Sequence, residues 1–190
     1  AKVVVNDLAA ADGSKSEGSL AVVAEIEKAG GEAIANGANV ANMQQVQIMV
    51  EQAMEKWGRI DILVNNAGIL RDKSFANMPI EDFKLVVDVH LMGSANCSKA
   101  VWSIMKQQNY GRIVMTTSSS GLYGNFGQAN YGAAKMAVVG LMNTLCIEGQ
   151  KNNIQINCLS PTARTAMTEE LIEAKRVLEL MTVESVTTGL

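Results

Sequence analysis

Short apolar runs alternate with helix-patterned segments along the whole chain. The apolar runs predict strands at 2–6, 32–36, 60–64, 112–116 and 154–159. Apolar residues recur at helical spacing over 19–29, 43–57, 79–108, 128–149 and 169–180, and a further helical pattern begins at 184. This alternation predicts the α/β class, with a doubly wound parallel sheet covered on both faces. Strands 60–64 and 113–115 lack polar alternation, which is typical of fully buried parallel strands.

Composition places the chain among ordinary globular domains. It has 190 residues, 48% hydrophobic and 18% charged, which suits a single domain over 1–190. A net charge of −3 and a pI near 5.2 argue against a nucleic-acid-binding domain. No stretch of about 18 uncharged apolar residues occurs, so we expect no membrane span.

The positions of the cysteines and of the single histidine argue against a disulfide-stabilised protein and against a metal-binding protein. Cys97, Cys146 and Cys158 lie far apart in apolar contexts, and His90 is the one histidine. This spacing predicts neither a disulfide framework nor a metal site. Buried free thiols are typical of a reducing compartment, so we expect a cytoplasmic protein.

Polar residues stand where several predicted strands end. They are Asp7, the run Asn65-Asn66-Ala67-Gly68, Ser118 and the run Ser160-Pro161-Thr162. Ligands of open parallel sheets bind at the carboxyl ends of the strands. We therefore expect these residues to border one site.

Three of the side chains suit proton transfer. Tyr131 and Lys135 lie four residues apart at the start of a predicted helix, and Ser118 precedes Tyr131 by thirteen residues. A phenol has a pKa near 10, and a nearby ammonium and a helix N-terminus lower it. Such a phenol exchanges a proton with an alcohol or carbonyl, the serine holds the oxygen, and hydride goes to a cofactor. Taken alone, the pair of Tyr131 and Lys135 is more typical of an ordinary amphipathic helix, and Ser118 is also consistent with a plain loop.

Taken together, these motifs resemble the short-chain dehydrogenase/reductase family over essentially the whole chain. The resemblance implies a Rossmann-type fold, nicotinamide-dependent oxidoreduction and a homodimer or homotetramer. Tyr131 then corresponds to the general acid/base, Lys135 to the residue that lowers its pKa and holds the nicotinamide ribose, and Ser118 to the partner of the substrate oxygen. Asn65, Ala67 and Gly68 border the cofactor.

Stretches 3–8, 65–75 and 110–135 further resemble the (3R)-hydroxyacyl-CoA dehydrogenase part of type 2 multifunctional enzymes and its stand-alone bacterial relatives. This implies oxidation of a (3R)-hydroxyacyl-CoA thioester by NAD in fatty acid metabolism, in peroxisomes if the chain is part of a eukaryotic multifunctional enzyme. The alternatives are an NADPH-dependent 3-oxoacyl-carrier-protein reductase, which shares Arg71-Asp72, a dehydrogenase of another secondary alcohol, and a non-catalytic fragment.

The resemblance to this family also suggests which residues bind the cofactor. Asp7 ends the first strand, where a carboxylate accepts hydrogen bonds from the adenosine ribose and repels a 2′-phosphate, so NAD is expected over NADP. The alternative is an aspartate that caps a turn. The remaining cofactor candidates are Asn39, Val40, Pro161 and Thr162.

His90 stands where the family usually has an asparagine, and we expect it to support catalysis, although a satisfied core histidine is the alternative. The expected substrate-binding residues beside Ser118 are Tyr123, Phe126, Gln128 and Arg164. Three basic residues are candidates for binding the phosphates of CoA: Arg71, Lys73 and Arg164. The alternative is that their charges are solvated at the surface.

No GxxxGxG or GxGxxG turn occurs in the 190 residues. We therefore expect the chain to begin at the family's second strand and to end before its last strand, as a domain incomplete at both ends.

Overall fold

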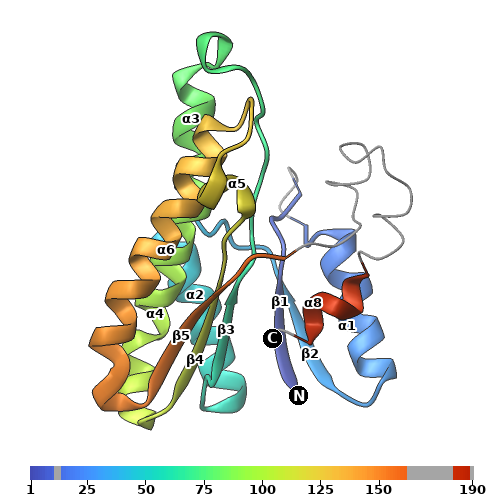
Figure 1. The fold of residues 1–190 in the computed structure, drawn as a ribbon. Helices are drawn as coiled ribbons and strands as arrows, with labels where there is room; N and C mark the ends of the chain where they lie inside the picture. Colours follow the sequence, from blue (N-terminus) through green and yellow to red (C-terminus); the bar gives the residue numbers. More distant parts are fainter. Residues whose placement is uncertain (11–13, 162–181, 189–190) are drawn as a thin grey trace.

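The computed structural model describes residues 1–10, 14–161 and 182–188 (Figure 1). The strands are β1 (Lys2–Asn6), β2 (Glu32–Asn36), β3 (Ile62–Asn65), β4 (Gly111–Thr116) and β5 (Ile154–Leu159). The helices are α1 (Glu17–Lys28), α2 (Met43–Trp57), α3 (Ile80–Val87), α4 (Gly93–Gln108), α5 (Ser119–Tyr123), α6 (Ala129–Gly149) and α8 (Val183–Thr187). All five predicted strands are confirmed, with small shifts at β3 and β4. The helix predicted at 169–180, Thr162 and Arg164 lie outside the described residues.

All the described strand pairs are parallel, as predicted, but they form two sheets. One sheet pairs β1 with β2, and the other has the order β3-β4-β5. Figure 1 shows β1 and β2 beside the three-stranded sheet. The predicted parallel α/β fold is confirmed, and among the described residues no hydrogen-bonded pairing joins β1 to β3.

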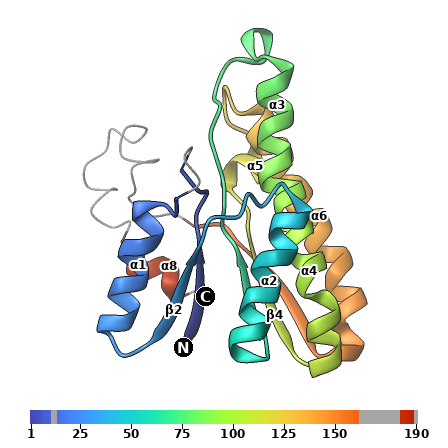
Figure 2. The ribbon, with the colours of Figure 1, turned by 180° about the vertical axis from the view of Figure 1, so that it is seen from behind.

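The main core lies on one face of the three-stranded sheet. Ile113 and Met115 of β4 are 1% and 0% exposed, and they pack in one cluster with Met105 of α4. Helices α4 and α6 contact this sheet and α2 contacts α4, whereas α1 contacts β1 and β2 (Figure 2). On β3, Ile62 and Val64 are 63% and 45% exposed. The expectation that this strand is buried on both faces is thus not met within the part of the chain that the structure describes.

The segment predicted as one long helix over 79–108 is interrupted. α3 ends at Val87, a π-helical turn η2 (Asp88–Met92) follows, and α4 continues the path. Pro79 directly precedes the first helical residue. Single π-helical turns inside α-helices are frequent at functional sites, and this one carries His90.

Residues 118–127 are rich in serine and glycine, which favour loops, but part of them is helical. Ser118 caps α5, since its Oγ accepts a hydrogen bond from the Ser120 amide at 3.2 Å. The helix stops after Tyr123, where Gly124 has a φ of 80°. A serine N-cap and a positive-φ glycine thus enclose one helical turn within a sequence rich in turn residues.

Two further expectations concern the chain as a whole. Cys97, Cys146 and Cys158 are free thiols, and Cys97 is buried. Within the part of the chain that the structure describes, no helix has both the length and the apolar character needed to cross a bilayer.

Candidate active site

Four predicted catalytic side chains meet beyond the carboxyl ends of β3 and β4. Tyr131 is the centre of the group. The ring of His90 meets the Tyr131 ring edge to face, with centroids 5.1 Å apart and an interplanar angle of 89°. Lys135 Nζ lies 5.5 Å from the same ring, and the Ser118 side chain interacts with the Tyr131 hydroxyl. The sequence-based grouping of these residues is therefore matched by their geometry.

Lys135 is anchored to the end of β4. Its Nζ donates a hydrogen bond to the carbonyl of Thr116 at 2.6 Å, and the hydroxyl of Thr117 donates to the Lys135 carbonyl at 2.9 Å. The residue is only 4% exposed. Burial lowers the pKa of Lys135 to about 8, because a desolvated ammonium is disfavoured. Its charge is thus fixed in place next to Tyr131.

The pKa of Tyr131 departs from the expectation. Burial raises it above the usual value of 10, the hydrogen-bonding interaction with Ser118 lowers it, and the charge of Asp72 raises it. We expected a lowered pKa, and this expectation is wrong for the described residues because desolvation outweighs the stabilisation of the phenolate. Burial therefore favours the phenol form of Tyr131 over the phenolate.

His90 is a neutral, buried side chain. Its Nε2 faces the backbone of Ile69, 3.1 Å from the amide nitrogen and 2.9 Å from the carbonyl oxygen, and the tautomer decides which of the two bonds forms. Burial, and then the charge of Lys135, lowers the pKa of His90 to about 4. Its Nδ1 is buried without a hydrogen-bond partner among the described residues. His90 thus connects the loop after β3 to the Tyr131 ring.

The Asn-Asn-Ala-Gly run joins β3 to its neighbours. Asn65 Nδ2 donates to Ser98 Oγ on α4 at 3.3 Å, and Thr116 Oγ1 donates to Asn66 Oδ1 at 3.3 Å. A Cβ at Gly68 would stand 2.4 Å from His90 Cε1. Glycine is therefore required here because the imidazole lies directly against its backbone.

Asp7 has the surroundings expected of a ribose-binding carboxylate. Its Oδ2 accepts a hydrogen bond from Ser16 Oγ at 2.5 Å. Ser16 is the N-cap of α1 and accepts from the Ser19 amide at 3.0 Å, so its hydroxyl proton is directed to Asp7. Next to Asp7, Asn6 Oδ1 is buried without a hydrogen-bond partner among the described residues. These acceptors fit the hydroxyl groups of a nucleoside, and buried Lys135 fits the nicotinamide end.

Other predicted cofactor residues are placed differently. Val40 is 9% exposed and packs in the core with Val46 and Cys97. Asn39 Oδ1 accepts a hydrogen bond from the Ala41 amide at 3.0 Å. Pro161 is exposed just beyond β5.

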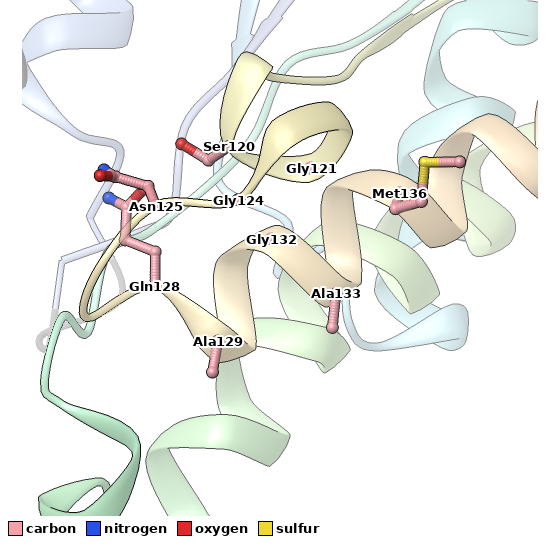
Figure 3. A pocket seen from close by; sticks show the side chains of 9 residues that line it. All are labelled: Ser120, Gly121, Gly124, Asn125, Gln128, Ala129, Gly132, Ala133 and Met136. Carbon is pink, nitrogen blue, oxygen red and sulfur yellow. The ribbon is translucent and has the colours of Figure 1, made fainter.

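The predicted substrate residues divide into two groups. Tyr123 and Phe126 are 87% and 90% exposed, so they project from the surface instead of lining a cavity. Gln128 is 6% exposed, and its amide is bound to Asp72 and Asn125. A pocket of about 320 Å³ between α5 and α6 is lined by Asn125, Gln128 and seven further residues shown in Figure 3. Tyr131 is not among them, so this pocket lies outside the catalytic group.

One functional residue was missed from the sequence. Asn130 is completely buried in the first turn of α6, its Nδ2 donates to the Arg71 carbonyl at 3.0 Å, and its Oδ1 accepts from the Tyr131 amide at 2.7 Å. The amide side chain directly before Tyr131 was the available signal.

A parallel α/β fold with a Ser–Tyr–Lys group beyond its strand ends defines a Rossmann-type oxidoreductase. A family model described as "short chain dehydrogenase" matches residues 6–176. The chain belongs to the short-chain dehydrogenase family.

Known proteins resemble the chain closely. It is 53% identical over 175 residues to "Peroxisomal multifunctional enzyme type 2" of Drosophila melanogaster, which covers 90% of this chain and 29% of that protein. It is 44% identical over 181 residues to "3-oxoacyl-[acyl-carrier-protein] reductase" of Synechocystis, covering 95% and 71%. A crystal structure of a short chain dehydrogenase from Mycobacterium avium superposes with a TM-score of 0.81 at 37% identity, covering 97% and 70%. The chain spans less than a third of the Drosophila relative.

Proposed function

We propose that the protein oxidises a (3R)-hydroxyacyl-CoA thioester to the 3-oxoacyl thioester, with NAD as the hydride acceptor. The observation that carries this proposal is the convergence of Ser118, His90 and Lys135 on Tyr131. The substrate class is supported by relatives named multifunctional enzyme and "Peroxisomal hydratase-dehydrogenase-epimerase", the latter 51% identical in Saccharomyces cerevisiae.

In the proposed reaction the Ser118 hydroxyl donates a hydrogen bond to the substrate oxygen. The phenolate form of Tyr131, stabilised by the positive charge of Lys135, takes the hydroxyl proton and becomes a phenol as the C–O bond gains double-bond character. A nicotinamide dinucleotide held by Asp7 and Lys135 would supply the acceptor for the hydride that leaves the carbinol carbon. In the reverse direction, protonated Tyr131 returns the proton to the carbonyl oxygen, which suits its raised pKa.

The preference for NAD over NADP rests on Asp7. The hydroxyl of Ser16, the N-cap of α1, holds one oxygen of the Asp7 carboxylate in place. A fixed negative charge there accepts bonds from two ribose hydroxyls and repels a 2′-phosphate. Steady-state kcat/KM values for both cofactors test this: we expect NAD to be favoured and Asp7→Ser to reduce the preference, whereas equal values for the wild type would contradict it.

The substrate assignment is tested by NADH formation. We expect activity with (3R)-hydroxybutyryl-CoA, little with its (3S) enantiomer, and little with a simple secondary alcohol that lacks the thioester. Higher kcat/KM for the simple alcohol would replace the thioester with another secondary alcohol as the substrate class.

A second candidate is reduction of a 3-oxoacyl-carrier-protein with NADPH. The 44% identity to the Synechocystis reductase, of which the chain covers 71%, favours it. The carboxylate of Asp7 opposes it because of the 2′-phosphate of NADPH. NADPH oxidation with 3-oxoacyl-carrier-protein that is faster than NADH formation from the CoA thioester would select this second function.

We further propose that the protein is a homodimer or homotetramer in which α6 faces a second copy. Ala133, Met136, Gly140 and Ile147 are exposed at helical spacing, and none of them is charged. Met136 and Ile147 are 49% and 76% exposed. Light scattering after size-exclusion chromatography is expected to show a dimer or larger, and Met136→Lys is expected to shift it toward monomer.

The compartment is also a proposal. Relatives carry the word peroxisomal in their names, and the sequence pattern of free cysteines suits a reducing compartment. We propose a cytoplasmic location for a stand-alone protein and a peroxisomal one for part of a eukaryotic multifunctional enzyme. Fractionation of cells that produce the full-length protein tests the assignment.

A further inference from the structure

The loop after β3 is tied to the start of α6 by consecutive residues. The hydrogen bonds are Asn130 Nδ2 to the Arg71 carbonyl (3.0 Å), Gln128 Nε2 to Asp72 Oδ2 (2.7 Å) and the Lys73 amide to the Gly127 carbonyl (2.9 Å). The two segments are more than fifty residues apart in sequence. This set of bonds fixes the backbone that leads into Tyr131.

Gln128 is the centre of this arrangement. It is 6% exposed, and both ends of its amide are bound: Nε2 donates to Asp72, and Oε1 accepts from Asn125 Nδ2 at 3.0 Å. Figure 3 shows the side chains of Asn125 and Gln128 next to each other where α6 begins. A buried amide with both ends bound has one orientation, and a carboxylate acceptor makes that bond strong. Asp72 is therefore held in a defined position.

The same loop reaches Tyr131 from two directions. Asn130, which binds the Arg71 carbonyl, also accepts from the Tyr131 amide. On the other side, the backbone of Ile69 binds the His90 ring that meets Tyr131 edge to face. Displacement of the loop would consequently move both supports of the phenol.

We propose that Asp72 is a positioning residue for Tyr131: through Gln128 its carboxylate fixes the first turn of α6, and its negative charge opposes the charge of the phenolate. This inference rests on the proposed role of Tyr131 in proton transfer. It assigns Gln128 to the support of the catalytic helix and not to direct substrate binding.

Several groups act on Tyr131 together. The titratable or polar ones are Asp72 from the loop after β3, His90 from η2, Lys135 from α6 and Ser118 at the cap of α5, while Cys158 of β5 acts on Lys135. After burial and the Ser118 interaction, the charge of Asp72 is a further influence, and it raises the pKa of Tyr131. A negative charge disfavours a nearby second negative charge, so its removal favours the phenolate.

The effect of the Asp72 charge on Tyr131 is tested by ultraviolet titration of tyrosinate in the full-length protein without cofactor. The chain has three tyrosines, and subtraction of the Tyr131→Phe spectrum isolates Tyr131. Asp72→Asn keeps an oxygen acceptor for Gln128 but removes the charge, and we expect Tyr131 to titrate at lower pH. Asp82→Asn is the matched control, because the Asp82 carboxylate pairs with Lys73 at 3.5 Å and, among the described residues, makes no hydrogen bond to α6. We expect no shift in this variant. An unshifted titration in Asp72→Asn would overturn the electrostatic role.

The positioning role is tested by Gln128→Leu in the NADH assay. We expect kcat to fall about 10- to 100-fold with a smaller change in KM, since small displacements of a catalytic group reduce rates strongly. A kcat within about twofold of the wild type would overturn this role. If Tyr131→Phe retained full activity, the proposed function would fail, whereas the tyrosinate titration would still report on Asp72.

Discussion

The burial of His90 predicts a loss of stability in mild acid. The pKa of His90 is lowered to about 4, because burial and the Lys135 charge oppose a second positive charge, whereas an unfolded histidine titrates near 6.5. Between these values the unfolded chain binds more protons than the folded one. The free energy of unfolding therefore falls as the pH falls from 6.5 toward 4, and the contribution of His90 is fully present only above pH 6.5.

The magnitude follows from the two pKa values. Each pH unit within the window is equivalent to about 1.4 kcal/mol, so a change from pH 7 to pH 4.5 is expected to cost about 2–3 kcal/mol. Because His90 is 3% exposed, solvent screening reduces this little. It is also the one histidine in the chain, so no second imidazole contributes to this titration.

Urea denaturation at both pH values, on the wild type and on His90→Gln, measures the effect. Glutamine does not titrate, and it retains polar groups that can bind the Ile69 backbone. The carboxylates are common to both proteins, so the difference between their pH slopes isolates His90. Equal slopes, or a His90 proton resonance that titrates near 6.5, would refute the reasoning.

Further predictions concern single contacts. Gly68→Ala is expected to destabilise the fold by about 1–3 kcal/mol in thermal or urea denaturation, because the added Cβ would clash with His90. His90→Ser in the same chain is expected to recover part of this loss of stability. Ser16→Ala is expected to cost about 1 kcal/mol as a lost N-cap and to weaken the preference for NAD; an unchanged cofactor ratio would separate Ser16 from Asp7. Lys135→Met is expected to raise the pKa of Tyr131 in the tyrosinate titration, because it removes a positive charge 5.5 Å from the ring. An unchanged titration would show that this charge does not act on the phenol.

The sequence predicted the elements well where periodicity and turn residues agree. Glu32–Asn36, Met43–Trp57 and Ile154–Leu159 are confirmed at the predicted bounds, because apolar spacing, Gly58 and Asn153 mark them. The short α5 was missed, since one turn of helix held by a serine cap leaves no periodic pattern. The π-helical turn at His90 was missed for a similar reason: the apolar pattern continues through it.

In the candidate site, too, some features were predictable from the sequence and others were not. Motif spacing brought Ser118, Tyr131 and Lys135 together correctly. It did not predict that burial raises the pKa of Tyr131, because desolvation depends on packing around the side chain. The bond between Asp72 and Gln128 joins residues 56 positions apart, and only the tertiary structure brings them into contact.

The most direct test of the account is NADH formation from (3R)-hydroxybutyryl-CoA by the full-length wild type and by Tyr131→Phe. Phenylalanine keeps the ring that packs against His90 but removes the hydroxyl that transfers the proton. We expect clear activity in the wild type and a loss of at least about 100-fold in the variant. A variant that retains more than about a tenth of the wild-type rate would contradict the role of Tyr131 as the catalytic acid/base.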